Sequence, residues 1–265
     1  MSRLASTFAA LRADNRPGLV TYVTAGDPDL DRSRKILTAL GAAGADVIEV
    51  GVPYSDPVAD GPAIQRASER ALAAGGSLTA TLDLMEATKD VQTPPRVLFT
   101  YVNPVFRMGV KPFADRAADV GVDGVLLLDL PIEEAETVHP TFAQAGIDQI
   151  FLVSPTTSDA RLFEAGRLGR GFLYAISRLG VTGVRSEVAG TAAPLVARVR
   201  AVTSLPVALG FGVSRPEHVA QIGRFADAAV VGSALVEVIR TADEDGEDVE
   251  QAVRAFVRWL KVGDA

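Results

Sequence analysis

An α/β fold, and within that class a single (β/α)8 TIM barrel, is predicted by three features of the sequence. Eight short runs rich in Val, Leu and Ile recur, and each is followed by an amphipathic stretch about twice as long. Strand and helix together repeat at roughly thirty residues. The 265 residues contain no Pro-, Gly- and Ser-rich linker. Because this alternation is typical of a parallel sheet covered by helices, and eight strands favour closure, we expect one barrel domain over residues 1–265.

The apolar runs give the expected strands in chain order. Each run is short and rich in β-branched residues, as strands buried on both faces are. The predicted strands are Leu19 to Thr24, Val47 to Val50, Val97 to Tyr101, Gly124 to Leu128, Gln149 to Val153, Phe172 to Ser177, Pro206 to Gly210 and Ala228 to Val231.

The amphipathic stretches give the expected helices. Pro112 and Pro216 suit a first helical turn. Extra helices are expected at the N-terminus, in a doubled region after the second strand that Gly75-Gly76-Ser77 interrupts, and after the eighth strand. The predicted helices are Leu4 to Arg12, Leu30 to Ala43, Ile64 to Lys89 (doubled), Pro112 to Val120, Glu133 to Ala145, Asp159 to Leu168, Ala193 to Val202, Pro216 to Phe225, the short Ala234 to Ile239, and Val249 to Lys261.

Composition excludes several classes of function. A net charge of -7 and a pI near 5.0 disfavour nucleic-acid binding, which requires a surplus of basic residues. The absence of cysteine excludes disulfides, thiolate nucleophiles and zinc sites built on sulfur. The first seventeen residues lack the apolar core of a secretory signal, and no apolar run is long enough to cross a bilayer. We therefore expect a cytoplasmic protein.

One carboxylate lies where a barrel places its chemistry. Active sites of such barrels gather at the carboxyl ends of the strands. Glu49 interrupts the apolar run Val47 to Pro53, at the end of the second predicted strand. Burial raises the pKa of a carboxyl group toward the range that is useful for proton transfer. A structural glutamate, satisfied by an arginine or by backbone amides, is an equal alternative at this point.

The loop that follows adds two more carboxylates. Asp56 and Asp60 lie between Tyr54 and Pro62, in a segment restrained by two prolines and a glycine. Ordinary turn aspartates are the alternative for either residue. Their closeness to Glu49 favours a site.

A phosphate-binding cradle is predicted in the last quarter of the chain. Gly210 to Ser214 follow the seventh predicted strand, and Gly232-Ser233 follow the eighth, just before a short helix. Unobstructed backbone amides and the positive end of a helix bind a dianion, and barrels often build this site after strands seven and eight. A single Gly-x-Gly is usually only a tight turn, but glycines after both strands together favour the cradle.

The residue inventory narrows the chemistry. The four lysines, Lys35, Lys89, Lys111 and Lys261, all lie outside the predicted strands, which disfavours a Schiff-base aldolase. The two histidines, His139 and His218, fall in predicted helices, so no metal cluster is expected. Nucleotide-binding and zinc-peptidase motifs are absent from the sequence. Of the chemistries considered, the residue inventory leaves acid–base catalysis by carboxylates on a phosphorylated substrate.

The segment Ile48 to Pro62, IEVGVPYSDPVADGP, closely resembles the signature of tryptophan synthase alpha subunits. Four further segments are similar to the family, so that the resemblance runs nearly end to end. These segments are Tyr22 to Pro28 (YVTAGDP), Tyr101 to Pro104 (YVNP), Asp129 to Pro131 (DLP) and Tyr174 to Gly183 (YAISRLGVTG). The resemblance implies cleavage of indole-3-glycerol phosphate to indole and glyceraldehyde 3-phosphate, without a cofactor in this chain.

The resemblance also implies roles for individual residues. It makes Glu49 the general acid–base, Asp60 the partner of the indole ring nitrogen, and Tyr174 an active-site tyrosine beside the glutamate. A buried core hydroxyl is the alternative for Tyr174. The remaining implied roles are substrate binding by Tyr22, Tyr101, Leu126, Leu128, Val153, Phe211 and Thr182, phosphate binding by Gly183, Gly212, Gly232 and Ser233, and partner contact by Asp56 and Pro57.

Three positions depart from the family pattern. Tyr22 and Tyr54 stand where many relatives carry Phe, and Leu128 is larger than expected. No catalytic group is lost, but the shape of the pocket is left open.

By the same resemblance, the partner is a pyridoxal-phosphate-dependent beta subunit in an alpha2beta2 assembly. A free-standing indole-3-glycerol-phosphate lyase would use the same Glu49 and Asp60, and partner binding would distinguish it. Two other barrel enzymes of the same pathway are disfavoured because their families rely on strand-borne lysines or on a cysteine. A barrel that binds ligand without turnover, and only regulates a partner, is a further alternative.

Overall fold

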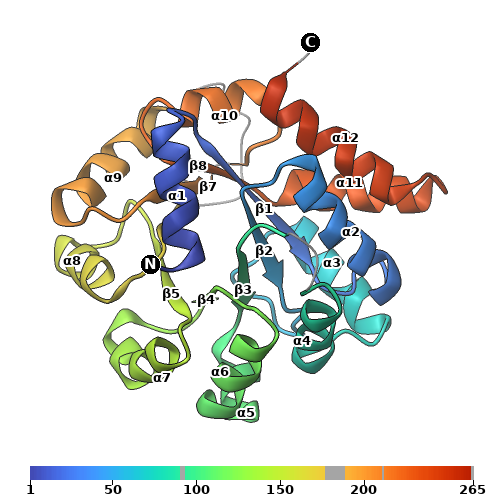
Figure 1. The fold of residues 1–265 in the computed structure, drawn as a ribbon, viewed down its shortest axis with the longest axis horizontal. Helices are drawn as coiled ribbons and strands as arrows, with labels where there is room; N and C mark the ends of the chain where they lie inside the picture. The colour runs from blue at the N-terminus through green and yellow to red at the C-terminus, as the bar shows by residue number, and fades with distance from the viewer. Residues whose placement is uncertain (90–92, 177–188, 211, 264–265) are drawn as a thin grey trace.

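The barrel expected from the sequence is confirmed. The structure is a computed structural model that describes residues 1–89, 93–176, 189–210 and 212–263. In these residues eight parallel strands pair in chain order, and β8 pairs with β1 to close the ring, which the helices surround (Figure 1). The strands are β1 (Gly18–Thr24), β2 (Val47–Gly51), β3 (Arg96–Thr100), β4 (Gly124–Leu127), β5 (Asp148–Val153), β6 (Leu173–Ile176), β7 (Val207–Gly210) and β8 (Ala228–Val231).

The helices follow the strands, with the predicted additions at both ends and after β2. Ser77, which follows the two glycines, caps the second helix of the doubled region through its side chain. The helices are α1 (Arg3–Ala13), α2 (Leu30–Ala43), α3 (Pro62–Ala73), α4 (Leu78–Ala87), α5 (Val102–Met108), α6 (Val110–Asp119), the 3-10 helix η1 (Ile132–Thr137), α7 (His139–Gln144), α8 (Asp159–Leu168), α9 (Ala189–Val202), α10 (Pro216–Ile222), α11 (Ser233–Glu244) and α12 (Val249–Val262).

The single helix predicted from Glu133 to Ala145 is wrong. The segment is a short 3-10 helix, η1, followed by α7, in which Pro140 occupies the first turn. Proline has no N–H and clashes with the carbonyl four residues earlier, which disfavours a continuous α-helix through Pro140. The connection between β4 and β5 is therefore covered by two short helices.

Helix α5 was not predicted from the sequence. Tyr101, expected as the last residue of a strand, is instead the N-cap of this seven-residue helix. The Asp129 carboxylate, which follows β4, accepts a hydrogen bond of 2.7 Å from the Val102 N–H in the first turn. Because this partner comes from a distant part of the chain, local sequence does not reveal the helix.

Helix α1 closes the amino-terminal end of the barrel. Leu4, Phe8 and Leu11 recur on one helical face and pack in the inner core cluster with strand residues such as Val20 and Val47. A larger outer cluster fills the space between the strands and the surrounding helices. The amino-terminal end is therefore filled with apolar side chains, and the carboxyl end is left for a site. No helix in the described part of the chain is long and apolar enough to span a membrane.

A buried arginine holds the ends of two helices. Arg96, at the start of β3, is 2% exposed and donates to the carbonyls of Met85 and Val120, at 2.9 and 2.8 Å. These carbonyls lie at the carboxyl ends of α4 and α6, where backbone acceptors lack helical partners. Burial lowers the pKa of the Arg96 guanidinium. The Arg96 guanidinium therefore caps the carboxyl ends of both helices by donating hydrogen bonds to their carbonyls.

Replacing Arg96 with methionine is expected to lower the free energy of unfolding by about 3 kcal/mol or more, because the buried carbonyls lose their donors. Urea unfolding measures this loss. The matched control is Arg116→Met, which removes only ion pairs with Asp83 and Glu86 on the surface of α6 and should cost about 1 kcal/mol or less. Equal losses in the two variants would contradict the capping role.

Candidate active site

Glu49 is buried, and its carboxylate has no partner in the described part of the chain. Glu49 lies on β2, two residues after Val47, whose side chain packs in the inner cluster. Because every second residue of a strand faces the same side, the Glu49 side chain also points into the barrel. The residue is 0% exposed, and neither carboxylate oxygen has a hydrogen-bond partner among the described residues. Burial raises the pKa of Glu49 to about 8. The structural alternative, a glutamate satisfied by arginine or amides, is therefore not what the structure shows.

Two tyrosines lie close to this carboxylate. Tyr22 on β1 is the register partner of Glu49, and its ring packs edge-on against Phe99, with 5.2 Å between ring centroids. Tyr174 on β6 lies across the barrel mouth, 6.4 Å from the same Phe99 ring. Burial, and then the charge of Glu49, raises the pKa of the Tyr174 hydroxyl well above its ordinary value. Tyr174 thus stays a neutral hydroxyl in the field of the glutamate.

Asp60 is held by a tyrosine from the next strand. The Tyr101 hydroxyl donates to Asp60 Oδ2 at 3.0 Å and accepts the Ala59 N–H at 3.0 Å, so one side chain fixes this part of the loop. The Tyr54 ring stacks on Tyr101 with 4.8 Å between centroids. Burial raises the pKa of Asp60 to about 6, although the Tyr101 hydrogen bond opposes the shift. Asp60 is therefore mostly ionised at neutral pH.

The predicted apolar slot is only partly brought together. Leu126 belongs to the inner cluster and Leu128 packs against it. Val153 does not lie with them: it packs in the outer cluster, because alternate residues of β5 face opposite sides of the barrel wall. Leu152, which sequence analysis missed, packs against the inner cluster instead. The sequence shows that residues of β5 alternate between the two faces of the barrel wall. Which of Leu152 and Val153 faces inward depends on how β5 pairs with its neighbours.

The glycines after β7 and β8 lie at neighbouring strand ends. The β7–β8 register runs to the pair Gly210 and Val230, two residues before Gly212 and Gly232. Gly212 has φ +75°, a backbone that favours glycine. Gly232 is the N-cap of α11 and makes no side-chain cap, so the first amides of α11, starting at Ser233, are open to an anion. Phe211, Thr182 and Gly183 lie outside the described residues.

Neither histidine hydrogen-bonds to Glu49 or Asp60 among the described contacts. The Nδ1 atom of His139, the first residue of α7, is 3.2 Å from Gln149 Oε1, and His218 Nδ1 accepts the Ser214 N–H. No three His, Asp or Glu side chains of the described residues cluster as metal ligands do. The arrangement offers proton transfer by carboxylates in an apolar chamber.

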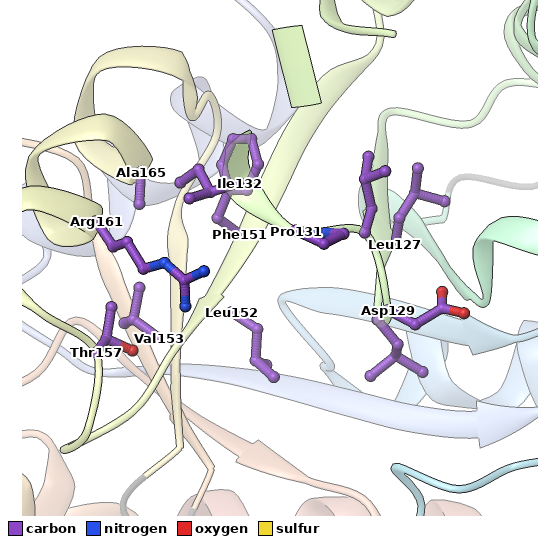
Figure 2. A pocket seen from close by; sticks show the side chains of 12 residues that line it. Leu127, Asp129, Pro131, Ile132, Phe151, Leu152, Val153, Thr157, Arg161 and Ala165 are labelled. Carbon is purple, nitrogen blue, oxygen red and sulfur yellow. The ribbon is translucent and has the colours of Figure 1, made fainter. Parts of the chain in front are cut away.

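A cavity of about 330 Å³ adjoins the site at the ends of β4 and β5 (Figure 2). It touches the barrel mouth at Leu128 and Leu152 and extends outward to Thr157, Arg161 and Ala165 near and on α8. Its walls include side chains from both faces of β5.

Gly51 is required by Tyr22. A Cβ atom at position 51 would lie 2.1 Å from the Tyr22 hydroxyl, so Gly51→Ala forces the ring to move. We expect this variant to lose about 1–3 kcal/mol of unfolding free energy. Tyr22→Phe should restore part of that loss in the double variant, because the nearest clashing atom is gone but ring carbons at 2.6 and 2.8 Å stay. Strict additivity in urea unfolding would contradict this account.

Fold and site together define a class of protein: a (β/α)8 barrel with two carboxyl groups of raised pKa, Glu49 on β2 and Asp60 in the loop after β2. The sequence model of the family described as "Tryptophan synthase alpha chain" matches residues 8–264. The chain belongs to the tryptophan synthase alpha chain family, and it is a lyase.

Relatives match over nearly the whole chain. The tryptophan synthase alpha chain of Geotalea uraniireducens is 46% identical over 99% of this chain and 98% of its own length. That of Methylococcus capsulatus is 50% identical, over 96% and 95%. The solved alpha subunit of Legionella pneumophila has a TM-score of 0.91 at 36% identity, with 98% and 97% coverage. The aminoacrylate-bound tryptophan synthase of M. tuberculosis has a TM-score of 0.89 at 39% identity, with 99% of both chains covered.

Proposed function

We propose that this chain cleaves indole-3-glycerol phosphate to indole and glyceraldehyde 3-phosphate as the alpha subunit of a tryptophan synthase, with Glu49 and Asp60 as its catalytic residues. The observation that carries the assignment of roles is the fully buried carboxyl group of Glu49, which has no hydrogen-bond partner among the residues that the structure describes. Its pKa of about 8 allows it both to hold and to give up a proton near neutral pH. Family membership supports the reaction itself.

The reaction is a retro-aldol cleavage that needs two proton movements. A proton added to indole C3 turns the ring into an electron sink. Loss of the proton from the neighbouring side-chain hydroxyl then breaks the bond between C3 and that carbon, whose electron pair restores the aromatic ring while the carbon becomes the aldehyde. Glu49 serves both transfers, so that the net proton balance is zero.

Asp60 stabilises the charge that builds up in between. A carboxylate facing the ring N–H offsets the positive charge of the C3-protonated ring, which is stabilisation directed at the transition state. The raised pKa of Asp60, about 6, still leaves it ionised at neutral pH, and Tyr101 fixes its orientation. The glycines after β7 and β8, with the amides of α11, would hold the phosphate. Thr182 and Gly183 are assigned to closure and phosphate binding through the resemblance alone.

A partner surface is supported by exposed apolar side chains. Val58, next to Asp56 and Pro57, is 85% exposed, and Phe106 on α5 is 51% exposed. A hollow of about 650 Å³ is lined by residues of the same loop and of α5, such as Tyr54 and Met108. Such surfaces mark contacts between proteins. We assign this face to a pyridoxal-phosphate-dependent beta subunit in an alpha2beta2 complex, located in the cytoplasm.

The function is tested by indole release from indole-3-glycerol phosphate, with and without a tryptophan synthase beta subunit. Weak activity that rises at least several-fold with the beta subunit is expected. Strong activity that is indifferent to the beta subunit would instead identify a free-standing lyase. Binding of the substrate without cleavage under either condition would indicate a regulatory barrel and refute the proposal.

A further inference from the structure

The barrel wall opens between β4 and β5. The register of these strands ends at the pair Leu126 and Ile150, whereas β5 continues to Val153 beside β6. The residues beyond the last pair, Leu127 and Leu128 on one side and Leu152 on the other, line the cavity of about 330 Å³. These residues come from both faces of the strands, so the cavity adjoins the barrel mouth at Leu128 and Leu152.

Short helices surround the cavity on its outer side. Pro140 divides the connection after β4 into η1 and α7, each of six residues. Ile132 of η1 and Ala165 of α8 border the cavity without closing it. Phe151, which is 7% exposed, also lines the cavity. Helix α8 contributes two lining residues, the small Ala165 and the long Arg161.

The charged groups at this cavity are already paired. Arg161 donates to Glu133 through Nε at 2.7 Å and Nη2 at 3.1 Å. The Asp129 carboxylate points away from Arg161 and accepts the Val102 N–H (Figure 2). Because Arg161 is ion-paired with Glu133 and the Asp129 carboxylate is hydrogen-bonded to a backbone N–H, an ionic ligand gains little here. A flat guanidinium edge, the Phe151 ring and aliphatic walls favour a neutral aromatic molecule.

We propose that this lateral cavity is a second binding site for a neutral bicyclic aromatic molecule, and that it receives the indole released at Glu49. The identity of the ligand rests on the proposed function, whereas the site itself rests on the opening between β4 and β5. Leu128 and Leu152 border both spaces, so indole moves between them without leaving apolar surroundings. The cavity thus keeps the product near the barrel mouth until it is transferred.

The test is 19F NMR of 5-fluoroindole, with equilibrium dialysis of indole, on the full chain. Indole-3-propanol phosphate, which lacks the hydroxyl needed for cleavage, blocks the barrel mouth. Under this block the wild type is expected to keep one bound population. Ala165→Leu, which fills the cavity from α8, should abolish it. The matched control Ala160→Leu adds the same atoms at an exposed position of α8 and should bind as the wild type does.

Each outcome bears on one claim. Loss of the blocked-state population in Ala165→Leu but not in Ala160→Leu supports the second site. Absence of that population in the wild type, or its persistence in Ala165→Leu, overturns it. Cleavage of indole-3-glycerol phosphate by the wild type is measured in parallel. A wild type that binds 5-fluoroindole in the cavity but does not cleave the substrate refutes the proposed function and leaves the site.

Discussion

Glu49→Gln is expected to lower kcat for indole release by about a thousandfold or more, because glutamine keeps the shape of the side chain but cannot transfer a proton. The loss should be similar with and without the beta subunit, since a partner cannot supply the missing acid–base group. Steady-state kinetics on the purified variant measures it. KM for indole-3-glycerol phosphate should change much less, because the phosphate and the ring are held elsewhere.

The same substitution should stabilise the fold above neutral pH. The pKa of Glu49 is raised from 4.5 to about 8 by burial, so the folded state prefers the protonated form. A raised folded-state pKa contributes stability that is fully present below about pH 4.5 and is lost as the pH rises through about 8. Glu49→Gln removes this titration. Its free energy of unfolding should exceed that of the wild type by roughly 3–5 kcal/mol at pH 9 and by close to zero at pH 4.

This pairing of effects separates a catalytic role from a structural one. A misfolded variant would lose activity and stability together, whereas an inactive variant of raised alkaline stability is what removal of a buried, unpaired carboxylate produces. Urea unfolding at several pH values supplies the comparison. Retention of a tenth or more of the wild-type kcat would show that Glu49 is not the acid–base group.

The sequence predicted the strands well, for a physical reason. A parallel barrel buries its strands on both faces, which leaves continuous apolar runs that are easy to locate. A charged residue such as Glu49 is conspicuous within such a run. Glycines likewise follow β7 and β8, where the phosphate cradle stays a prediction. Pro140 marks the break between η1 and α7 in the sequence itself.

Features that depend on tertiary contacts could not be predicted. The inner position of Leu152, rather than Val153, depends on the phase of β5 relative to its neighbours. Arg96 could not be recognised as a cap because its acceptors lie in two helices distant in sequence. The roles assigned to Phe211, Thr182 and Gly183 stay predictions that rest on the resemblance.

In the proposed mechanism, the ionisation of Asp60 sets the acidic limit of the reaction and that of Glu49 sets the alkaline limit. Asp60 must be ionised, and its pKa is about 6, whereas Glu49 must carry a proton to give to C3, and its pKa is about 8. The pH profile of kcat/KM for the wild type is therefore expected to be bell-shaped, falling below about pH 6 and above about pH 8.

Asp60→Asn should lower kcat/KM by about a hundredfold or more at pH 7, because a neutral amide cannot offset the charge on the protonated ring. The variant should also lose the acidic limb of the pH profile and keep the alkaline one. Tyr101→Phe is the matched partner: it removes the hydrogen bond that lowers the pKa of Asp60, so the acidic limb should move to higher pH. If the acidic limb persists unchanged in Asp60→Asn, the ionisation belongs to another group, and the proposed electrostatic role of Asp60 is wrong.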